Sequence, residues 1–198
     1  MQIIQTESMN DEQTWDITRQ IVRGLKYLHD NNIVHGDMKP NNLLVASDGT
    51  VKLGDFGISR IKDDGELLTE HAGTPSFMAP EVVSGESYDG KLADVYSVGA
   101  TMYYIRFGQP AFVAKSRQKL YQKILNDPVS FPSDVLSTVA DGLIHLIQGL
   151  MTKSPSMRIT MARLIVYPWL QTRPGGENTP NEEYSFSTSN EWSSITSE

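Results

Sequence analysis

The 198-residue sequence contains no cysteine. Disulfide bonds, thiolate catalysis and cysteine-based zinc sites are therefore excluded, and the lack of cysteine is typical of a reducing compartment. No stretch approaches the ~18–20 consecutive apolar residues that a membrane-spanning helix requires. The first residues also lack the basic start and the apolar run of a secretory signal. We therefore expect a cytoplasmic protein, with a nuclear location as the alternative, and no membrane partner.

The sequence has fewer basic than acidic residues: 17 Lys and Arg against 24 Asp and Glu, a net charge of −7. This balance argues against nucleic acid as a partner. The length allows one sizeable hydrophobic core, which we place in residues 1–170. Residues 171–198 are rich in Gly, Pro, Asn, Ser, Thr and Glu and contain few aliphatic residues. They cannot bury enough apolar surface to offset the entropy of ordering, so we expect a disordered tail there.

The apolar spacing of the folded part predicts a mainly helical structure. Helices are expected over residues 11–29, 93–107, 117–126 and 134–152. Asn10 and Gln13 suit the capping of the first helix, and the second is apolar on nearly every side, which indicates a buried core helix. Two short strands, over residues 43–45 and 51–53, are joined by turn-forming residues and predict a β-hairpin.

Polar residues suited to phosphate chemistry lie on both sides of this hairpin. Residues 35–42 read HGDMKPNN before it, and Asp55 opens the sequence DFG after it. Asn42 and Asp55 offer hard oxygen ligands for magnesium, and the hairpin would bring them to the same end. Lys39 supplies a charge for a phosphate, and Asp37 can hold the proton of an attacking hydroxyl. The pattern indicates phosphoryl transfer, which needs fixed cations and an oriented nucleophile.

These two motifs resemble the catalytic loop H-R-D-x-x-x-x-N and the metal loop D-F-G of protein kinases. Residues 73–81, GTPSFMAPE, resemble the kinase substrate loop that ends in A-P-E. Residues 94–99, DVYSVG, resemble the start of the central kinase helix, with Tyr96 in place of tryptophan. The resemblance covers about residues 9–170, and Lys39 is similar to the lysine of the serine/threonine branch.

Within that branch, the segments DGELLTEHAGTPSFMAPE and FGQPAF resemble two groups of kinases. One is the calcium/calmodulin-dependent protein kinase kinases, and the other activates AMP-activated-type kinases. This resemblance implies a protein substrate, which could itself be a kinase.

The family resemblance implies the C-terminal, large lobe of a protein kinase, mainly α, with a short β-hairpin carrying the catalytic and metal loops. It implies transfer of the γ-phosphoryl group of ATP to a protein Ser or Thr hydroxyl, with Mg²⁺. Asp37 and Lys39 would be catalytic, Lys39 also contacting the nucleotide, and Asn42 and Asp55 would hold the metal. Leu44 would lie under the adenine ring; an ordinary buried leucine is the alternative.

The resemblance gives other residues a place beside the substrate or in the architecture. Thr74 would bond near the catalytic aspartate and help to select a hydroxyl substrate, or else only cap a turn. Glu81 would pair with Arg158 as a structural ion pair. Asp94 would bind the backbone of the catalytic loop. The remaining structural residues are His35 and Phe56, with the histidine packed beneath the phenylalanine ring.

The family also has an N-terminal β lobe with a Gly-rich loop, a strand lysine and a helix glutamate. None of these motifs occurs in the sequence, so we expect only the C-terminal lobe here. The lost contacts to ATP would cost about 5 kcal/mol, or a thousandfold in affinity. We therefore expect the isolated chain to be weakly active or inactive, with a surface open to a missing lobe or a partner.

Gly36 departs from the family pattern, because most members have an arginine there that binds a phosphate on the activation segment. Glu70 already places an acid beside Thr69, the usual phosphorylation site, so we expect activity to depend weakly on that phosphorylation. Two other functions stay open. One is a non-catalytic interaction module formed by the lobe. The other is a small-molecule phosphotransferase similar to aminoglycoside kinases, which Gly36 fits but Lys39 and Arg158 disfavour.

Overall fold

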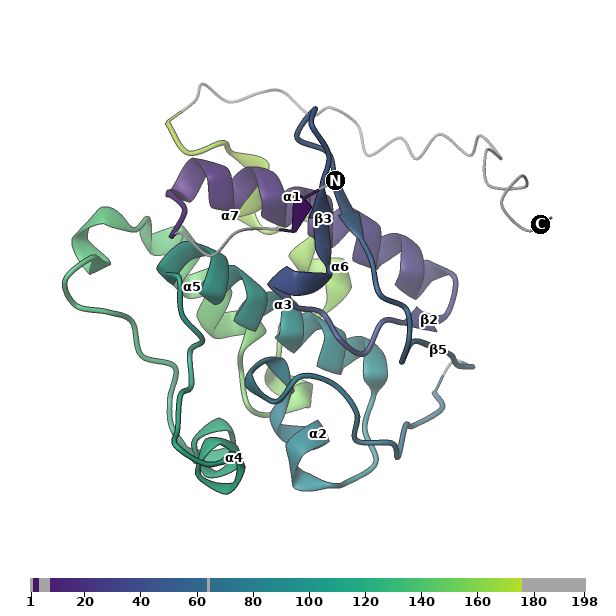
Figure 1. Ribbon diagram of the computed structural model, residues 1–198. Helices are drawn as coiled ribbons and strands as arrows, with labels where there is room; N and C mark the ends of the chain where they lie inside the picture. The colour runs from purple at the N-terminus through teal and green to yellow at the C-terminus, as the bar shows by residue number, and fades with distance from the viewer. Residues whose placement is uncertain (1, 4–7, 64, 176–198) are drawn as a thin grey trace.

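The computed structural model describes residues 2–3, 8–63 and 65–175 (Figure 1). Most of the predicted tail, residues 176–198, lies outside the described residues. The elements in chain order are β1 (Gln2–Ile3), α1 (Asp11–Asp30), β2 (Ile33–Val34), the 3₁₀ turn η1 (Pro40–Asn42), β3 (Leu43–Val45), β4 (Val51–Leu53), β5 (Arg60–Ile61), η2 (Pro75–Phe77), α2 (Pro80–Ser84), α3 (Gly90–Phe107), α4 (Arg117–Asn126), η3 (Leu136–Thr138), α5 (Asp141–Leu150), η4 (Pro155–Met157), α6 (Met161–Leu164) and α7 (Pro168–Gln171).

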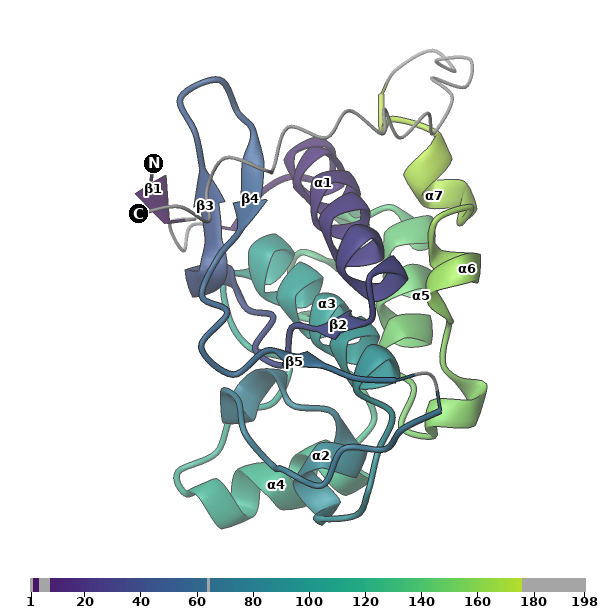
Figure 2. The same cartoon turned by 90° about the vertical axis from the view of Figure 1, so that its right-hand side faces the viewer.

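Helix α3 lies at the centre, with α1 and α5 packed against it and α2 and α4 below (Figure 2). Its buried residues extend around the helix and confirm the predicted core helix. The helix begins at Gly90, three residues before the predicted start at Ala93, because the Asp89 side chain caps it by accepting from the backbone N–H of Lys91. None of the described helices is long and apolar enough to cross a membrane.

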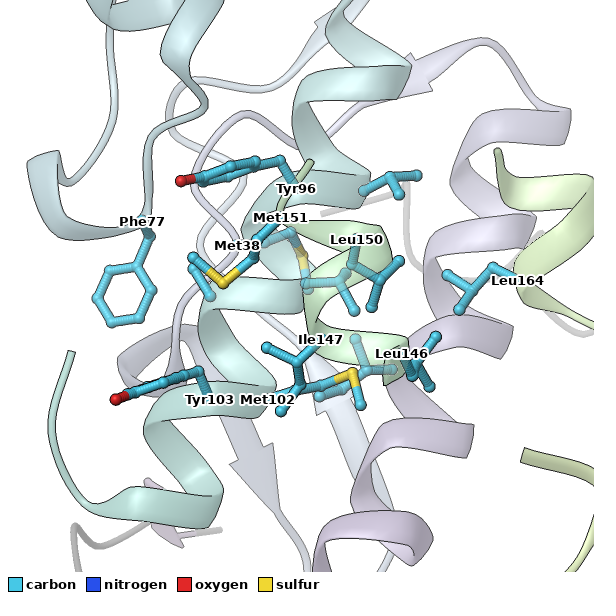
Figure 3. Close-up of a cluster of buried hydrophobic side chains, with 14 of the residues drawn as sticks. Met38, Phe77, Tyr96, Met102, Tyr103, Leu146, Ile147, Leu150, Met151 and Leu164 are labelled. Atoms are coloured by element: carbon cyan, nitrogen blue, oxygen red, sulfur yellow. The ribbon is translucent and has the colours of Figure 1, made fainter. Parts of the chain in front are cut away.

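The core between α3 and α5 is closely packed (Figure 3). Tyr96 of α3 lies beside Met151 at the end of α5, Met102 lies beside Ile147 one turn earlier, and all four side chains are buried. A Cβ at Gly99 would lie 2.7 Å from Cβ of Leu150, so the two helices can approach this closely only with glycine there. The central helix is therefore a rigid base for the loops bound to it.

Helix α1 begins with the predicted cap. The Asn10 side chain accepts from the backbone N–H of Gln13 at 2.9 Å, and the Gln13 side chain accepts from the backbone N–H of Asn10 at 3.1 Å. The helix buries Ile21 and Leu25 against the core and ends at Asp30, with Asn31 as its C-cap. Its C-terminal end leads directly into β2, which places the catalytic loop.

The predicted hairpin is confirmed. Strands β3 and β4 are antiparallel, with Leu43 opposite Leu53 and Val45 opposite Val51. Strand β1 pairs with the other edge of β3, and β2 pairs with β5. The loop over residues 35–42 therefore lies between two strands, as does the loop over residues 54–59, so both loops are fixed at their ends.

The single helix predicted over residues 134–152 is wrong. The chain forms η3, then an extended turn, then α5. The turn is fixed from outside: the Asp11 carboxylate accepts from the Ala140 backbone N–H, and the Arg106 guanidinium donates to the Thr138 carbonyl at 3.2 Å. These contacts with α1 and α3 replace the hydrogen bonds that a continuous helix would make. The C-terminal stretch divides similarly, into α6 and α7.

Candidate active site

The catalytic loop is bound to α3 through Asp94. Its carboxylate is buried and accepts from the backbone N–H groups of His35 and Gly36, each at 2.9 Å. This confirms the predicted role of Asp94. The side chain of His29 is a third partner, with Nε2 2.9 Å from Oδ2 of Asp94. A buried carboxylate with three such partners holds the loop backbone firmly.

Two glycines allow the catalytic loop and the substrate loop to meet. Gly36 has φ +80° and Gly73 has φ +124°, a region of backbone conformation that favours glycine. A Cβ at Gly73 would lie 3.0 Å from the carbonyl oxygen of Gly36. The glycine that replaces the usual arginine thus also suits the backbone conformation at this position. Gly73 was not among the predicted site residues, although it opens the quoted GTPSFMAPE segment.

Hydrogen bonds converge on the carboxylate of Asp37. Its Oδ1 accepts from the backbone N–H of Thr74 at 2.9 Å and from Oγ1 of Thr74 at 2.8 Å. Its Oδ2 accepts from Nζ of Lys39 at 2.5 Å and from Nδ2 of Asn42 at 3.2 Å. Lys39 also donates to Oγ1 of Thr74 at 2.8 Å. The structure therefore brings together four of the predicted site residues.

These contacts control the ionisation of Asp37. Burial alone would raise the pKa of this carboxyl, but the hydrogen bonds from Lys39 and Thr74, together with the Lys39 charge, outweigh it and lower the pKa below its ordinary value of 3.8. Asp37 is therefore a carboxylate at neutral pH. Its oxygens can accept a further hydrogen bond from a hydroxyl that approaches the partly open side of the site.

Asn42 and Asp55 lie where the hairpin begins and ends. The backbone N–H of Gly54 donates to the Asn42 carbonyl at 2.8 Å, so Asp55 follows directly after the pairing. Nδ2 of Asn42 donates to Asp37, which turns its Oδ1 away from that carboxylate. Asp55 is exposed and has φ +59°, uncommon outside glycine, and its Oδ1 accepts from the Gly57 backbone N–H at 3.3 Å. Among the described residues, the hydrogen bonds around Asp37 do not reach Asp55.

The side-chain oxygens of Asn42 and Asp55 suit magnesium as two of its ligands. No group of three or more His, Cys, Asp or Glu residues that could hold a metal occurs in the part of the chain that the structure describes. Asn42 and Asp55 alone would leave most coordination positions to phosphate oxygens and water. Magnesium prefers such sites, because it gives up its water reluctantly.

Leu44, predicted to contact the adenine ring, and His35 and Phe56, predicted to be structural, lie on and beside this hairpin. Leu44 is half-buried and pairs across β3 and β4 with Lys52. The His35 ring is buried, donates or accepts at 3.1 Å with the Gly54 carbonyl, and lies 5.2 Å from the Phe56 ring. The predicted packing of His35 beneath Phe56 is confirmed. Phe56 itself is 46% exposed.

The predicted ion pair of Glu81 and Arg158 is also confirmed. Nη1 and Nη2 of Arg158 lie 2.6 and 2.8 Å from the two carboxylate oxygens of Glu81. The guanidinium also donates to the carbonyls of Leu92 and Thr152 and lies 5.1 Å from the Tyr96 ring. This bidentate contact fixes α2, and with it the end of the substrate loop, to the helical core.

A second ion pair, which the sequence did not predict, lies just before the start of the substrate loop. Arg60 of β5 pairs with Glu70. Beside it, Leu68 and Tyr88 form an isolated antiparallel β-bridge, in which each backbone N–H donates to the other residue's carbonyl. Oη of Tyr88 also donates to the Glu70 carbonyl at 2.8 Å. These groups line a pocket of about 210 Å³ that also includes Thr69. Opposite charges ten residues apart on an irregular segment give no periodic signal from which the pair could be predicted.

Comparison with known proteins places this geometry in a family. The chain matches the family model described as protein kinase domain over residues 1–170. It is 46% identical to serine/threonine-protein kinase GRIK2 of Arabidopsis thaliana, over 77% of this chain and 37% of that protein. It is 42% identical to serine/threonine-protein kinase GRIK1 of the same plant, over 79% of this chain and 39% of that protein.

A relative of lower sequence identity is also a serine/threonine-protein kinase. The chain is 38% identical to serine/threonine-protein kinase 36 of Pongo abelii, over 86% of this chain and 13% of that protein. The chain therefore spans well under half the length of these relatives. The family match extends over the catalytic loop, the hairpin, the substrate loop and the helices that support them. The chain belongs to the protein kinase family.

Proposed function

We propose that this member of the family transfers the γ-phosphoryl group of ATP to a serine or threonine hydroxyl of a protein substrate. The observation that carries the proposal is the convergence of Lys39, Thr74 and Asn42 on the carboxylate of Asp37. Such an arrangement fixes a negatively charged acceptor beside a cation before any substrate arrives. Phosphoryl transfer gains most from this kind of prepared positioning and electrostatics.

Each residue has a separate task in the proposed reaction. Asp37 would accept a hydrogen bond from the attacking hydroxyl and hold its proton as the new P–O bond forms. Lys39, already within reach of Asp37 and Thr74, would neutralise charge on the transferring phosphoryl group. Asn42 and Asp55 would hold magnesium, which supplies charge neutralisation on the phosphate oxygens of ATP. Leu44 would supply an apolar surface for the adenine ring.

Two observations support the proposed substrate class. Thr74 donates to Asp37 and accepts from Lys39, so its hydroxyl lies in the polar cluster that an acceptor hydroxyl would enter. The named relatives are serine/threonine-protein kinases. We propose a Ser or Thr acceptor in a protein, with another kinase as a specific candidate on the resemblance described above.

A phosphotransfer assay with Mg-ATP and a protein substrate tests the function. Asp37→Asn should lower the rate about 10²–10⁴-fold, because the acceptor loses its oriented carboxylate. Asp48→Asn is the matched control: Asp48 lies on the hairpin turn, is exposed and bonds only locally to the backbone N–H of Thr50. In a form of the protein with ready phosphotransfer, equal rates with and without Asp37→Asn would contradict the proposal and favour a non-catalytic interaction module.

The same material tests the expected weakness of nucleotide binding. We propose that these residues alone bind Mg-ATP poorly, because the sequence offers no Gly-rich loop or strand lysine for the phosphates. Calorimetric titration with Mg-ATP should give a dissociation constant well above the low micromolar range. A value in the low micromolar range would contradict this part of the proposal and leave the reaction itself untouched.

A further inference from the structure

Four basic residues on and beside α4 form a surface that the reaction does not use. We call Lys115, Arg117, Lys119 and Lys123 the α4 basic surface. All four are exposed. The rest of the chain carries a net charge of −11, since the total of −7 includes the +4 of these residues. No acidic residue occurs between Asp94 and Asp127 in the sequence. Positive charge is thus concentrated in the short stretch from Lys115 to Lys123 of an acidic protein.

The three lysines of this surface, Lys115, Lys119 and Lys123, form no ion pair with a carboxylate in the part of the chain that the structure describes. Arg117 instead donates to Oη of Tyr121 at 2.7 Å, with its guanidinium 5.2 Å from that ring. Lysines unpaired in this way repel one another, and two of the basic residues lie in the first helical turn, where the helix dipole disfavours them. The helix dipole favours only Lys123, in the last turn, so helix stability does not explain Arg117 and Lys119.

The α4 basic surface lies next to the substrate loop. Helix α4 packs against α2 and η2, on the side of the molecule away from the hairpin (Figures 1 and 2). Ile124 is fully buried, and Oη of Tyr121 lies 3.9 Å from Sδ of Met78, four residues after Thr74. Val113, two residues before Lys115, is 60% exposed and adds an apolar contact. A protein whose hydroxyl reaches Asp37 would therefore have other segments close to α4.

From this placement we propose that the α4 basic surface binds an acidic segment of the protein substrate, separate from the residues around the phosphorylated hydroxyl. The inference rests on the proposed function and specifies one class of substrate. The helical part of the surface, from Arg117 to Lys123, spans on the order of 9 Å, the length of about three extended residues. An extended Asp- or Glu-rich segment of that length can face the surface. Charge complementarity of this kind raises association rates and selects among partners.

Binding of two labelled peptides to the full chain tests the surface independently of catalysis. Both peptides contain the same threonine-bearing sequence, followed by six glutamates in one and six glutamines in the other. Fluorescence anisotropy should show at least tenfold tighter binding of the glutamate peptide, and 0.5 M NaCl should remove this preference. Lys119→Glu with Lys123→Glu should weaken glutamate-peptide binding about tenfold or more.

A control variant separates the surface from total charge. Lys52→Glu with Arg163→Glu makes the same charge change at exposed positions on β4 and α6. It should leave binding of the glutamate peptide within about twofold, because distant exposed charges are screened. Equal weakening by both double variants, or no preference for the glutamate peptide, would overturn the proposal.

Other occupants are distinguished with the same variants. Vesicles containing phosphatidylserine, single-stranded RNA and a synthetic peptide of residues 176–198, which has five Glu and no basic residue, are tested as competitors. Tighter binding of any of them than of the glutamate peptide, lost in Lys119→Glu with Lys123→Glu, would assign the surface to that occupant and overturn the proposal. Competition weaker than that of the glutamate peptide supports it.

Phosphotransfer to the same peptides separates this inference from the proposed function. If a form of the protein with ready phosphotransfer phosphorylates neither peptide while the binding preference persists, the proposed function fails, and the surface still binds an acidic segment but not one of a substrate. If both peptides are phosphorylated equally and bind equally, the function stands and the site fails. Faster phosphorylation of the glutamate peptide, reduced by the α4 variant and unchanged in the control variant, supports both.

Discussion

Two arginine–glutamate ion pairs hold opposite ends of the segment beside Asp37, and they differ in burial. The Arg158 and Glu81 side chains are 0% and 9% exposed. The Arg60 and Glu70 side chains are 44% and 69% exposed. The first pair has two charge-assisted contacts plus backbone carbonyls around the guanidinium, and the second has one contact in open solvent.

The difference in burial gives the two arginine–glutamate ion pairs different effects on the loop. In the interior, removing one partner leaves a charge without water or counter-ion, so the buried pair fixes the end of the substrate loop to α3. At the surface, water replaces a lost partner and the net contribution is small. The loop therefore has a fixed end at α2 and an adjustable end near Thr69, next to the pocket between β5 and Tyr88.

The largest expected effect comes from breaking the buried pair. Glu81→Ala should lower the free energy of unfolding by about 3–5 kcal/mol, because Arg158 is left buried without a carboxylate. Urea denaturation followed by circular dichroism measures this. Glu86→Ala, which removes the same charge from an exposed position just after α2, is the control and should change it by less than about 0.5 kcal/mol. A loss below 1 kcal/mol for Glu81→Ala would show that the pair does not anchor the loop.

The next largest effect is expected at Thr69, which lines the pocket and precedes Glu70 of the exposed pair. Thr69→Ala should reduce kinase activity less than tenfold, measured in a form of the protein with ready phosphotransfer. The reason is that Glu70 already supplies the negative charge that faces Arg60, and Gly36 offers no second arginine for a phosphate. A larger loss, restored by a phosphate added to Thr69, would show that the adjustable end is set by phosphorylation.

The buried end could be predicted from the sequence, and the exposed end could not. Glu81 and Arg158 lie 77 residues apart, and only the family resemblance linked them. The Asn10–Gln13 cap and the hairpin were predictable from local chemistry, because their hydrogen bonds join residues close in sequence. Within the site, the resemblance placed Asp37 and its partners, and the structure brings them together.

The missed features depend on contacts from distant segments. His29 binds Asp94 across 65 positions, and no spacing rule connects them. The chain around Val139 is extended because Asp11 and Arg106 bind its neighbours, which overrides the helical pattern of residues 134–152. Arg60 and Glu70 meet where β5 pairs with β2 and where Leu68 pairs with Tyr88. Tertiary contacts of this kind decide the outcome wherever local preference is weak.

A smaller effect is expected from breaking the exposed pair itself. Glu70→Gln should lower the free energy of unfolding by about 0.2–1 kcal/mol, and 0.5 M NaCl should remove most of the difference from the unaltered chain. Urea denaturation at two salt concentrations measures both. Glu66→Gln is the control on the same segment. If Glu70→Gln costs as much as Glu81→Ala, the contrast between the two ends disappears.

The smallest effect concerns the ring that stacks on Arg158. Within the described structure, Oη of Tyr96 is buried without a hydrogen-bond partner, and burial raises its pKa above the ordinary value. Tyr96→Phe should therefore leave the free energy of unfolding unchanged or raise it by up to about 1 kcal/mol, since it removes an unsatisfied polar group. Tyr103→Phe, which loses the 2.9 Å bond from Oη to the Ser130 carbonyl, should cost about 0.5–1.5 kcal/mol in the same urea measurement. If Tyr96→Phe is the more costly of the two, the Tyr96 hydroxyl has a partner such as a bound water, and the buried end is held by more than the ion pair.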